Sequence, residues 1–301
     1  MKANTMAVSE SARSGAGRRV FASCLLGGCL AILAGLSTSL AQAATVEITA
    51  VFSPDPNNPQ VNRFKNTTPN SGVCLSYPHL CTPNGYFSIS LPGLQAISQT
   101  AILASHANVR NGAMFKVPAE PQPVQVTSAS GEVAKVLFSI SALSGTNRTR
   151  DVRLLTNQPG FSVSQAQNEL WGGNQWGWSS PTDCPRAVGM GATYIDANFL
   201  WFTPKSVPCG LSPAYEIDSL SMRNISVSYL MTSPDPLSMG SGIYRGSINY
   251  TVGPGGDFDF GDNLAPTYNI VTMNFTLSVE HTLKLQFPPG YGSVVLNPAG
   301  G

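Results

Sequence analysis

Apolar and polar residues alternate with a period of two along much of this chain, a pattern that is typical of strands. Residues 46–51 (VEITAV) show it most clearly. The same alternation, or a short apolar run, recurs at 124–127, 133–140, 225–231, 243–252, 268–279 and 282–287. Clusters of Gly, Pro, Asn and Asp separate these runs, as turns do between strands. Many short strands without helix–strand alternation predict an all-β sandwich or barrel.

One segment departs from this pattern. In residues 94–106, apolar side chains recur at the spacing that places them on one face of a helix. We therefore expect a short helix in this segment, within an otherwise all-β chain.

The first 43 residues have the features of a cleaved export signal. A basic start is followed by an apolar stretch over residues 20–36 and by the small-x-small sequence AQA at 41–43. The alternatives are a membrane anchor, a lipoprotein cleavage box ending at Cys29, and a twin-arginine signal at Arg18-Arg19. Glycines and hydroxyl residues dilute the apolar stretch, which favours cleavage after Ala43. We expect residues 1–43 to be a signal peptide and the remainder to be exported.

Charge is sparse and nearly balanced. The 301 residues include 17 Lys and Arg against 16 Asp and Glu, for a formal charge of +1. Removing residues 1–43 takes away four basic residues and one acidic residue and brings the charge to −2. Non-specific binding to nucleic acid needs a clear excess of Lys and Arg, so nucleic acid is excluded as the main partner.

Four cysteines remain after the signal peptide: Cys74, Cys81, Cys184 and Cys209. An even number in an exported chain predicts disulfides. Three pairings are possible, and the spacing favours neighbours, Cys74 with Cys81 and Cys184 with Cys209. Zinc is the alternative, but the chain has no C-x-x-C sequence and no paired histidines.

Five ordered blocks carry a resemblance to a known family. They are GVCLS at 72–76, DCP at 183–185, GIYRGSINY at 242–250, YNIVTMNFT at 268–276 and LKLQFP at 283–288. With these blocks the chain resembles the CblD/CfaE-type tip adhesins, the minor pilins that cap class 5 and cable-type bacterial fimbriae. The resemblance covers most of the chain after the signal peptide.

The resemblance implies two domains. The first is an adhesin domain, an immunoglobulin-like or jelly-roll β-sandwich with short helical segments, here over residues 44–288. The second is a pilin domain that is completed by a strand donated by a chaperone or by the next subunit. Residues 289–301 correspond to the linker and the start of that pilin domain, whose remainder is missing. The expected partners are a periplasmic chaperone, an outer-membrane usher and the major pilin subunit, with the chain at the fimbrial tip on the cell surface.

The resemblance also implies attachment to a host-surface glycan or glycoprotein and initiation of pilus assembly. In some relatives a cluster of arginines binds an acidic sugar. Arg63 or Lys65 matches the arginine that precedes the first cysteine block, but residues 251–253 (TVG) stand where the family has another base. A structural minor pilin that starts assembly without binding a receptor is the alternative.

Three of the four tryptophans, Trp171, Trp176 and Trp178, lie within eight residues and have glycine neighbours. On an exposed loop their rings can stack on sugars or anchor a protein partner. The alternative is that one or more of them fill the core near Cys184, as Trp beside a disulfide often does in β-sandwiches.

A second candidate for receptor binding is the basic group Arg148, Arg150 and Arg153. Guanidinium groups bind carboxylates with paired hydrogen bonds, including the carboxylate of an acidic glycan. The alternative is a solvated loop in which Asp151 neutralises part of the charge.

Catalysis and metal binding have little support in the sequence. The chain has three histidines and lacks G-x-S-x-G, H-E-x-x-H and phosphate-loop motifs. Acidic residues at 257, 259 and 262 have the alternation of calcium ligands, but a hairpin turn explains them equally well. We expect a binding protein that is not an enzyme and uses no cofactor and no metal.

Overall fold

The structure is a computed structural model that describes residues 43–55, 57–58, 60–173, 184–185 and 190–281, all within one compact unit. Several predictions fall outside these ranges and stay predictions: the signal peptide up to residue 42, Trp176, Trp178, the strand at 282–287, and residues 289–301.

The strand predictions are confirmed wherever the structure describes the residues. Each of the six predicted strands between residues 46 and 279 is present. Five of them have ends that differ by at most four residues from the prediction, whereas the strand predicted at 133–140 extends eight residues further, to Arg148. Within the described ranges the strands are β1 (Ala43–Phe52), β2 (Lys65–Asn66), β3 (Phe87–Ser90), β4 (Ala96–Ser98), β5 (Ala113–Phe115), β6 (Gln122–Ser128), β7 (Val133–Arg148), β8 (Asp196–Phe202), β9 (Cys209–Leu211), β10 (Ser221–Thr232), β11 (Gly242–Thr251), β12 (Leu264–Pro266) and β13 (Ile270–Val279).

The helices are short. They are α1 (Val73–Ser76), α2 (Pro78–Cys81), α3 (Val152–Leu155) and α4 (Val163–Trp171), with three 3-10 turns at Thr82–Asn84, Val109–Asn111 and Pro236–Ser238. Among the helices of the described residues, only α4 exceeds two turns. A capping box starts it, in which the Ser162 hydroxyl accepts a hydrogen bond from the backbone N–H of Gln165. This helix was missed in the sequence, where the S-x-x-Q spacing before an apolar run was its signal.

Eleven strands form one mixed sheet in the order β12-β4-β10-β7-β6-β11-β13-β1-β2, with β3 beside β10 and β8 beside β7. Strands β1 and β13 are parallel over ten residues, and the other neighbours in this sheet are antiparallel. Strand β6 pairs with residues 133–138 of β7, whereas β8 pairs with residues 142–148. The second half of β7 therefore lies between β8 and β10.

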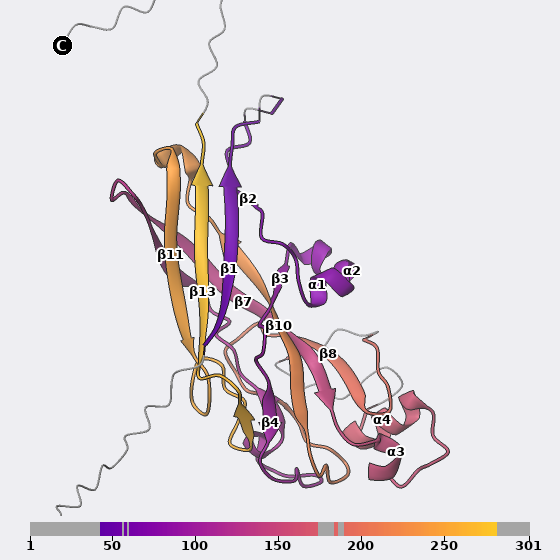
Figure 1. The fold of residues 1–301 in the computed structure, drawn as a ribbon. Coiled ribbons are helices and arrows are strands. Elements are labelled where there is room, and N and C mark those ends of the chain that lie inside the picture. Colours follow the sequence, from indigo (N-terminus) through magenta and orange to yellow (C-terminus); the bar gives the residue numbers. More distant parts are fainter. Residues whose placement is uncertain (1–42, 56, 59, 174–183, 186–189, 282–301) are drawn as a thin grey trace, which may run out of the picture. The chain divides into compact units, whose positions relative to one another are not determined.

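The sheet curls so that β7 and β10 face β13 across the core. Figure 1 shows β11, β13 and β1 side by side, with β7 and β10 passing behind them. Side chains join these two layers: the Phe138 ring of β7 lies 5.2 Å from both the Tyr229 ring of β10 and the Phe275 ring of β13, between centroids. The fold is thus mostly β, with a large curled mixed sheet.

A β-bulge in β7 changes which side chains face the core. The register with β10 shifts between Ile140 and Ala142, so Ser141 is the extra residue. Before the bulge Phe138 and Ile140 belong to the main core, whereas after it Leu143 does. The even-numbered side chains that follow, at 144, 146 and 148, therefore face away from the main core.

Both predicted disulfides are present. Cys74 pairs with Cys81, and Cys184 pairs with Cys209. The first links α1 to α2, and the second joins the β9 strand to the loop that precedes β8. Each of these four cysteines is buried, so the two bridges are part of the packed interior.

The helix predicted at 94–106 is wrong. Residues 96–98 form β4, which pairs with β10 and β12, and Ile102 forms an isolated bridge with Ile217. Neighbouring strands therefore bind the backbone N–H and C=O groups that a helix would have paired internally. Leu94 and Ile102 are buried, whereas Ile97 and Leu103, which have the same helical spacing, are exposed, so these positions do not form one buried face.

Candidate functional site

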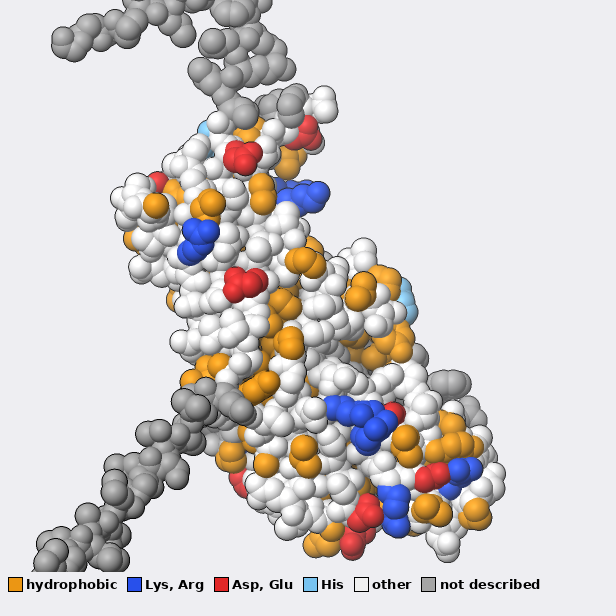
Figure 2. Space-filling model, viewed as in Figure 1, with side chains coloured by type: hydrophobic (Ala, Val, Ile, Leu, Met, Phe, Trp, Pro, Cys, Tyr) orange, Lys and Arg blue, Asp and Glu red, His pale blue; other side chains and the backbone are white. Residues whose placement is uncertain are grey.

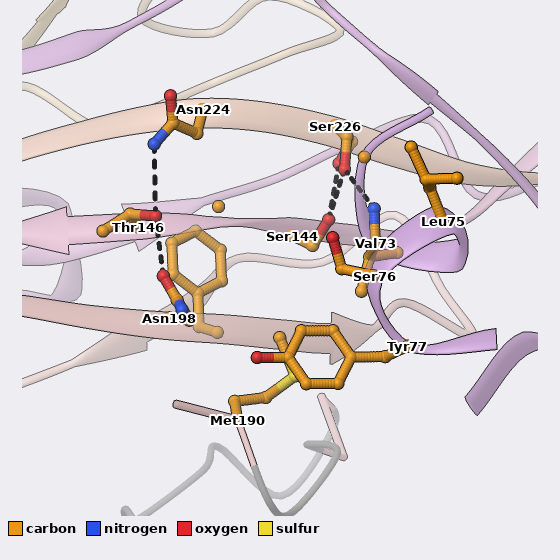
Figure 3. Close-up of a pocket in the computed structure, with 13 residues that line it drawn as sticks. Val73, Leu75, Ser76, Tyr77, Ser144, Thr146, Met190, Asn198, Asn224 and Ser226 are labelled. Carbon is orange, nitrogen blue, oxygen red and sulfur yellow. Dashed lines mark hydrogen bonds between the residues drawn. The ribbon is translucent and has the colours of Figure 1, made fainter. Parts of the chain in front are cut away.

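A pocket of about 270 Å³ lies on the outer side of the sheet, where α1 crosses β7, β8 and β10 (Figure 3). Its volume lies just below the roughly 300–1,000 Å³ of pockets for drug-sized ligands. The residues that line it are Gly72, Val73, Leu75, Ser76, Tyr77, Ser144, Gly145, Thr146, Met190, Asn198, Phe199, Asn224 and Ser226. Hydroxyl and amide groups predominate among the polar side chains of this lining.

Helix α1 forms one wall and is held to the sheet by serines. The backbone N–H of Val73 donates to Ser226 Oγ at 3.3 Å, and that of Cys74 donates to Ser88 Oγ at 2.8 Å. Gly72 precedes the helix with φ at +72°, and a Cβ there would lie 2.4 Å from Ser226 Cβ. Only glycine allows this close approach, so the GVCLS block at 72–76 fits the wall it forms.

The floor of the pocket is built around an irregularity in β10. The register with β7 shifts between Arg223 and Ser226, and Asn224 in that interval has φ at +53°. The left-handed conformation is tolerated by asparagine and places its side chain in the pocket. Thr146 Oγ1 donates to Asn198 Oδ1 at 2.8 Å and accepts a 3.5 Å hydrogen bond from Asn224 Nδ2. Figure 3 shows these three side chains in a row.

The apolar part of the lining consists of Val73, Leu75 and Met190 together with two aromatic residues. Tyr77 follows α1, and Phe199 stands on β8 beside Gly145. The Tyr77 hydroxyl accepts a 3.4 Å hydrogen bond from the Gly191 N–H, which links the α1 wall to the segment before β8. Phe199 is 5% exposed and packs in the main core, so half-buried Tyr77 is the ring that a ligand would meet. A pocket with one ring on its side and hydroxyl and amide groups on its floor is suited to a polar, uncharged ring-sized group.

A charged cluster adjoins the floor on the same face of the sheet. Asp196 accepts two hydrogen bonds from Arg148, at 2.9 and 2.7 Å, and two from Arg223, at 3.0 and 3.1 Å. The hydrogen bond from Arg148 is the main cause that lowers the pKa of Asp196 below its ordinary value. Asp196 is therefore a carboxylate at neutral pH, bound between two guanidinium groups.

The predicted basic group consists of paired arginines. Besides Arg148, Arg150 lies 3.2 Å from Asp218, and Arg153 lies 2.6 Å from Asp151 and packs over the Tyr194 ring. Figure 2 shows blue side chains against red ones in the part of the molecule that holds β8, α3 and α4. These arginines do not form one cluster, and none of them is among the pocket residues.

The other predicted receptor-binding residues lie elsewhere. Arg63 is on an exposed loop before β2 and does not line the pocket. Trp171 ends α4 and is 1% exposed, so it packs in the core, the alternative considered for this cluster, and offers no ring to a ligand. Trp176 and Trp178 lie outside the described residues.

Asp259, one of the acidic residues considered above as calcium ligands, is bound by other groups of the protein. Arg110 and the N–H groups of Gly255 and Gly261 donate to Asp259. Burial opposes ionisation of Asp259, but these hydrogen bonds outweigh it and lower its pKa. Among the described residues there is no group of three or more His, Cys, Asp or Glu that could hold a metal.

Comparison of the chain with family models, curated proteins and solved structures finds no match. The candidate site therefore rests on its geometry. None of the described helices is long and apolar enough to cross a bilayer.

Sequence reasoning did not identify the floor of the pocket. Thr146, Asn198, Asn224 and Ser226 belong to three strands, and no motif distinguishes them in the sequence. The wall is different, because residues 72–76 were already marked as one of the blocks that carry the family resemblance.

Proposed function

We propose that this chain is the adhesive tip subunit of a bacterial chaperone–usher fimbria, which attaches the cell to a host-surface glycan or glycoprotein and initiates pilus assembly. In this proposal the described domain is an immunoglobulin-like or jelly-roll adhesin sandwich. The chain is exported through the periplasm, where a chaperone and the outer-membrane usher receive it before the major pilin follows.

The observation that carries the proposal is the pocket under α1. Hydroxyl and amide groups from β7, β8 and β10 meet beside Tyr77 and Phe199, on a sheet that is fixed by backbone pairing and by a disulfide-linked wall. Such a combination binds a sugar through directed hydrogen bonds and ring contact. Rigid scaffolds lose little freedom on binding, which favours recognition of small ligands.

The same pocket favours binding over catalysis. Glycoside hydrolysis requires a pair of carboxyl groups that flank the scissile bond. Among the described residues that line the pocket there is no Asp, Glu, His or Cys. The disulfides and the block resemblance support an exported, fimbrial setting for such a binding protein.

The experiment is complementation of a strain that lacks this chain. Wild type should restore both fibres and adherence to host cells. Asn198→Ala, which removes an amide from the pocket floor, should restore fibres but not adherence. Asn249→Ala, an exposed asparagine on β11, is the matched control and should restore both.

Two results would contradict the proposal. If Asn198→Ala and wild type restore adherence equally, the pocket does not bind the receptor and the structural minor pilin is favoured. If the strain that lacks this chain keeps both its fibres and its adherence, the chain has no part in a fimbria.

A further inference from the structure

We propose that the pocket under α1 takes a sugar without charged substituents, and that Asp196 is the residue that sets this preference by holding Arg148 and Arg223. The inference rests on the glycan-binding function proposed above and names the class of glycan.

The floor presents one donor and one acceptor of hydrogen bonds, side by side. Thr146 uses its hydroxyl to orient both neighbouring amides, because it donates to Asn198 Oδ1 and accepts from Asn224 Nδ2. Within the described ranges, Asn198 Nδ2 and Asn224 Oδ1 have no hydrogen-bond partner in the protein. Two adjacent sugar hydroxyls match this pair, since one accepts from the Asn198 amide and the other donates to the Asn224 carbonyl.

Three charged side chains, Arg148, Asp196 and Arg223, lie beside the pocket and are not part of its lining. Arg148 and Asp196 each stand two residues from a floor residue on the same strand face, and Arg223 precedes Asn224. Two residues along a strand correspond to about 7 Å, close enough for a sugar substituent to reach the rim. The guanidinium groups are therefore near the ligand, and their hydrogen bonds decide whether they can act on it.

Asp196 occupies the groups that an acidic sugar would need. Arg148 donates hydrogen bonds from Nε and Nη2 to the two carboxylate oxygens of Asp196. Arginine binds a ligand carboxylate with the same paired geometry. Arg223 gives Nη2 to both oxygens as well. A ligand carboxylate must displace Asp196 to gain the paired contact with Arg148, whereas a neutral sugar does not meet this cost.

The first test compares glycans in matched pairs. Immobilised oligosaccharides ending in neutral hexoses are measured beside the same oligosaccharides carrying sialic acid or sulfate, with the full chain in solution. We expect wild type to bind the neutral member at least tenfold more tightly. This binding should change little between about 0.05 and 0.5 M salt, because screening acts on charge pairs.

Substitution of Asp196 then tests its role in this preference. Asp196→Asn keeps the shape of the side chain but frees both arginines, so the neutral-to-acidic preference should fall at least tenfold. Asp218→Asn is the matched control, since it removes the same charge from the exposed Arg150–Asp218 pair and should leave the preference unchanged. If Asp196→Asn does not fold, Thr146→Val replaces it and should weaken neutral-glycan binding at least tenfold.

Several outcomes would overturn the inference: a wild-type preference for the acidic member, an unchanged preference in Asp196→Asn, an equal change in Asp218→Asn, or unchanged binding in Thr146→Val. Absence of glycan binding by wild type would overturn it too. Adherence in the complementation experiment decides the adhesin proposal separately, because adherence to a protein receptor would leave that proposal standing.

Discussion

The wall of the pocket depends on a single glycine, and its replacement gives a demanding test of the structure. At Gly72 the backbone has φ at +72°, and an added Cβ would lie 2.4 Å from both Cβ and Oγ of Ser226. Carbon atoms in contact normally stay about 3.5–4.0 Å apart. Ser226 stands on a central strand and is 1% exposed, so the α1 wall must move instead.

The magnitude follows from three contributions. A side chain in the left-handed region costs about 1 kcal/mol. Overpacking against the strand costs about 1–3 kcal/mol. Displacement of α1 also breaks the hydrogen bonds to Ser226 and Ser88, at about 1 kcal/mol each. Gly72→Ala should therefore lower the free energy of unfolding by about 4–6 kcal/mol and abolish glycan binding.

Gly85→Ala is the matched control. Gly85 also has a left-handed backbone, with φ at +65°, and lies in the turn after α2, but no atom lies within 4 Å of an added Cβ. Its replacement should cost only the backbone contribution of about 1 kcal/mol and leave binding intact. Urea unfolding and glycan binding are measured for both variants. Equal losses of stability, within about 0.5 kcal/mol, would refute the packing of α1 described above.

Further predictions concern the core, a disulfide and a buried ion pair. Trp171→Ala should lower the free energy of unfolding by about 3–5 kcal/mol in urea, because the ring is buried; a loss below about 1 kcal/mol would contradict its place in the core. Replacing Cys74 and Cys81 by serine should cost about 2.5 kcal/mol and abolish glycan binding, since a four-residue helix is not stable alone; retained binding would show that the wall needs no disulfide. Arg110→Met should cost about 2–3 kcal/mol at pH 7. The pKa of Asp259 is lowered in the folded state, so its ion pair with Arg110 stabilises the fold above the ordinary Asp pKa of about 4, and this stabilisation is lost as the pH falls through the folded pKa. The difference in the free energy of unfolding between wild type and Arg110→Met should therefore shrink below about pH 4. A difference that grows below this pH would contradict the pairing.

Local pattern determined six of the thirteen described strands and the two disulfides, but it missed β8, which carries Asn198. Side chains that point alternately to the core and to solvent leave a period of two in the sequence. Strand β1 has this alternating burial along its length, so it could be predicted without a structure. The same holds for β13. Neighbouring cysteines pair because a short loop brings them together in any compact chain, and both bridges follow this rule.

Local pattern failed where tertiary contacts replaced local ones. The spacing at 94–106 fits one helix face, but β10 and β12 bind this backbone and Ile102 bridges to Ile217. The tryptophan cluster was predicted as one loop, but Trp171 is the last residue of α4 and packs in the core. Spacing cannot distinguish a buried helix end from a loop when glycines follow it.

The sequence by itself thus determined that the chain is mostly strands with two neighbouring disulfides and balanced charge. Only the tertiary structure decided the candidate site. A bulge at Ser141 reverses which side chains of β7 face outward, and a second irregularity places Asn224 beside Thr146. Asn198 on β8 contacts Thr146, which lies 52 residues away along the chain. Bulges and register are set by pairing between distant strands, and such pairing leaves no periodic trace in the residues it brings together.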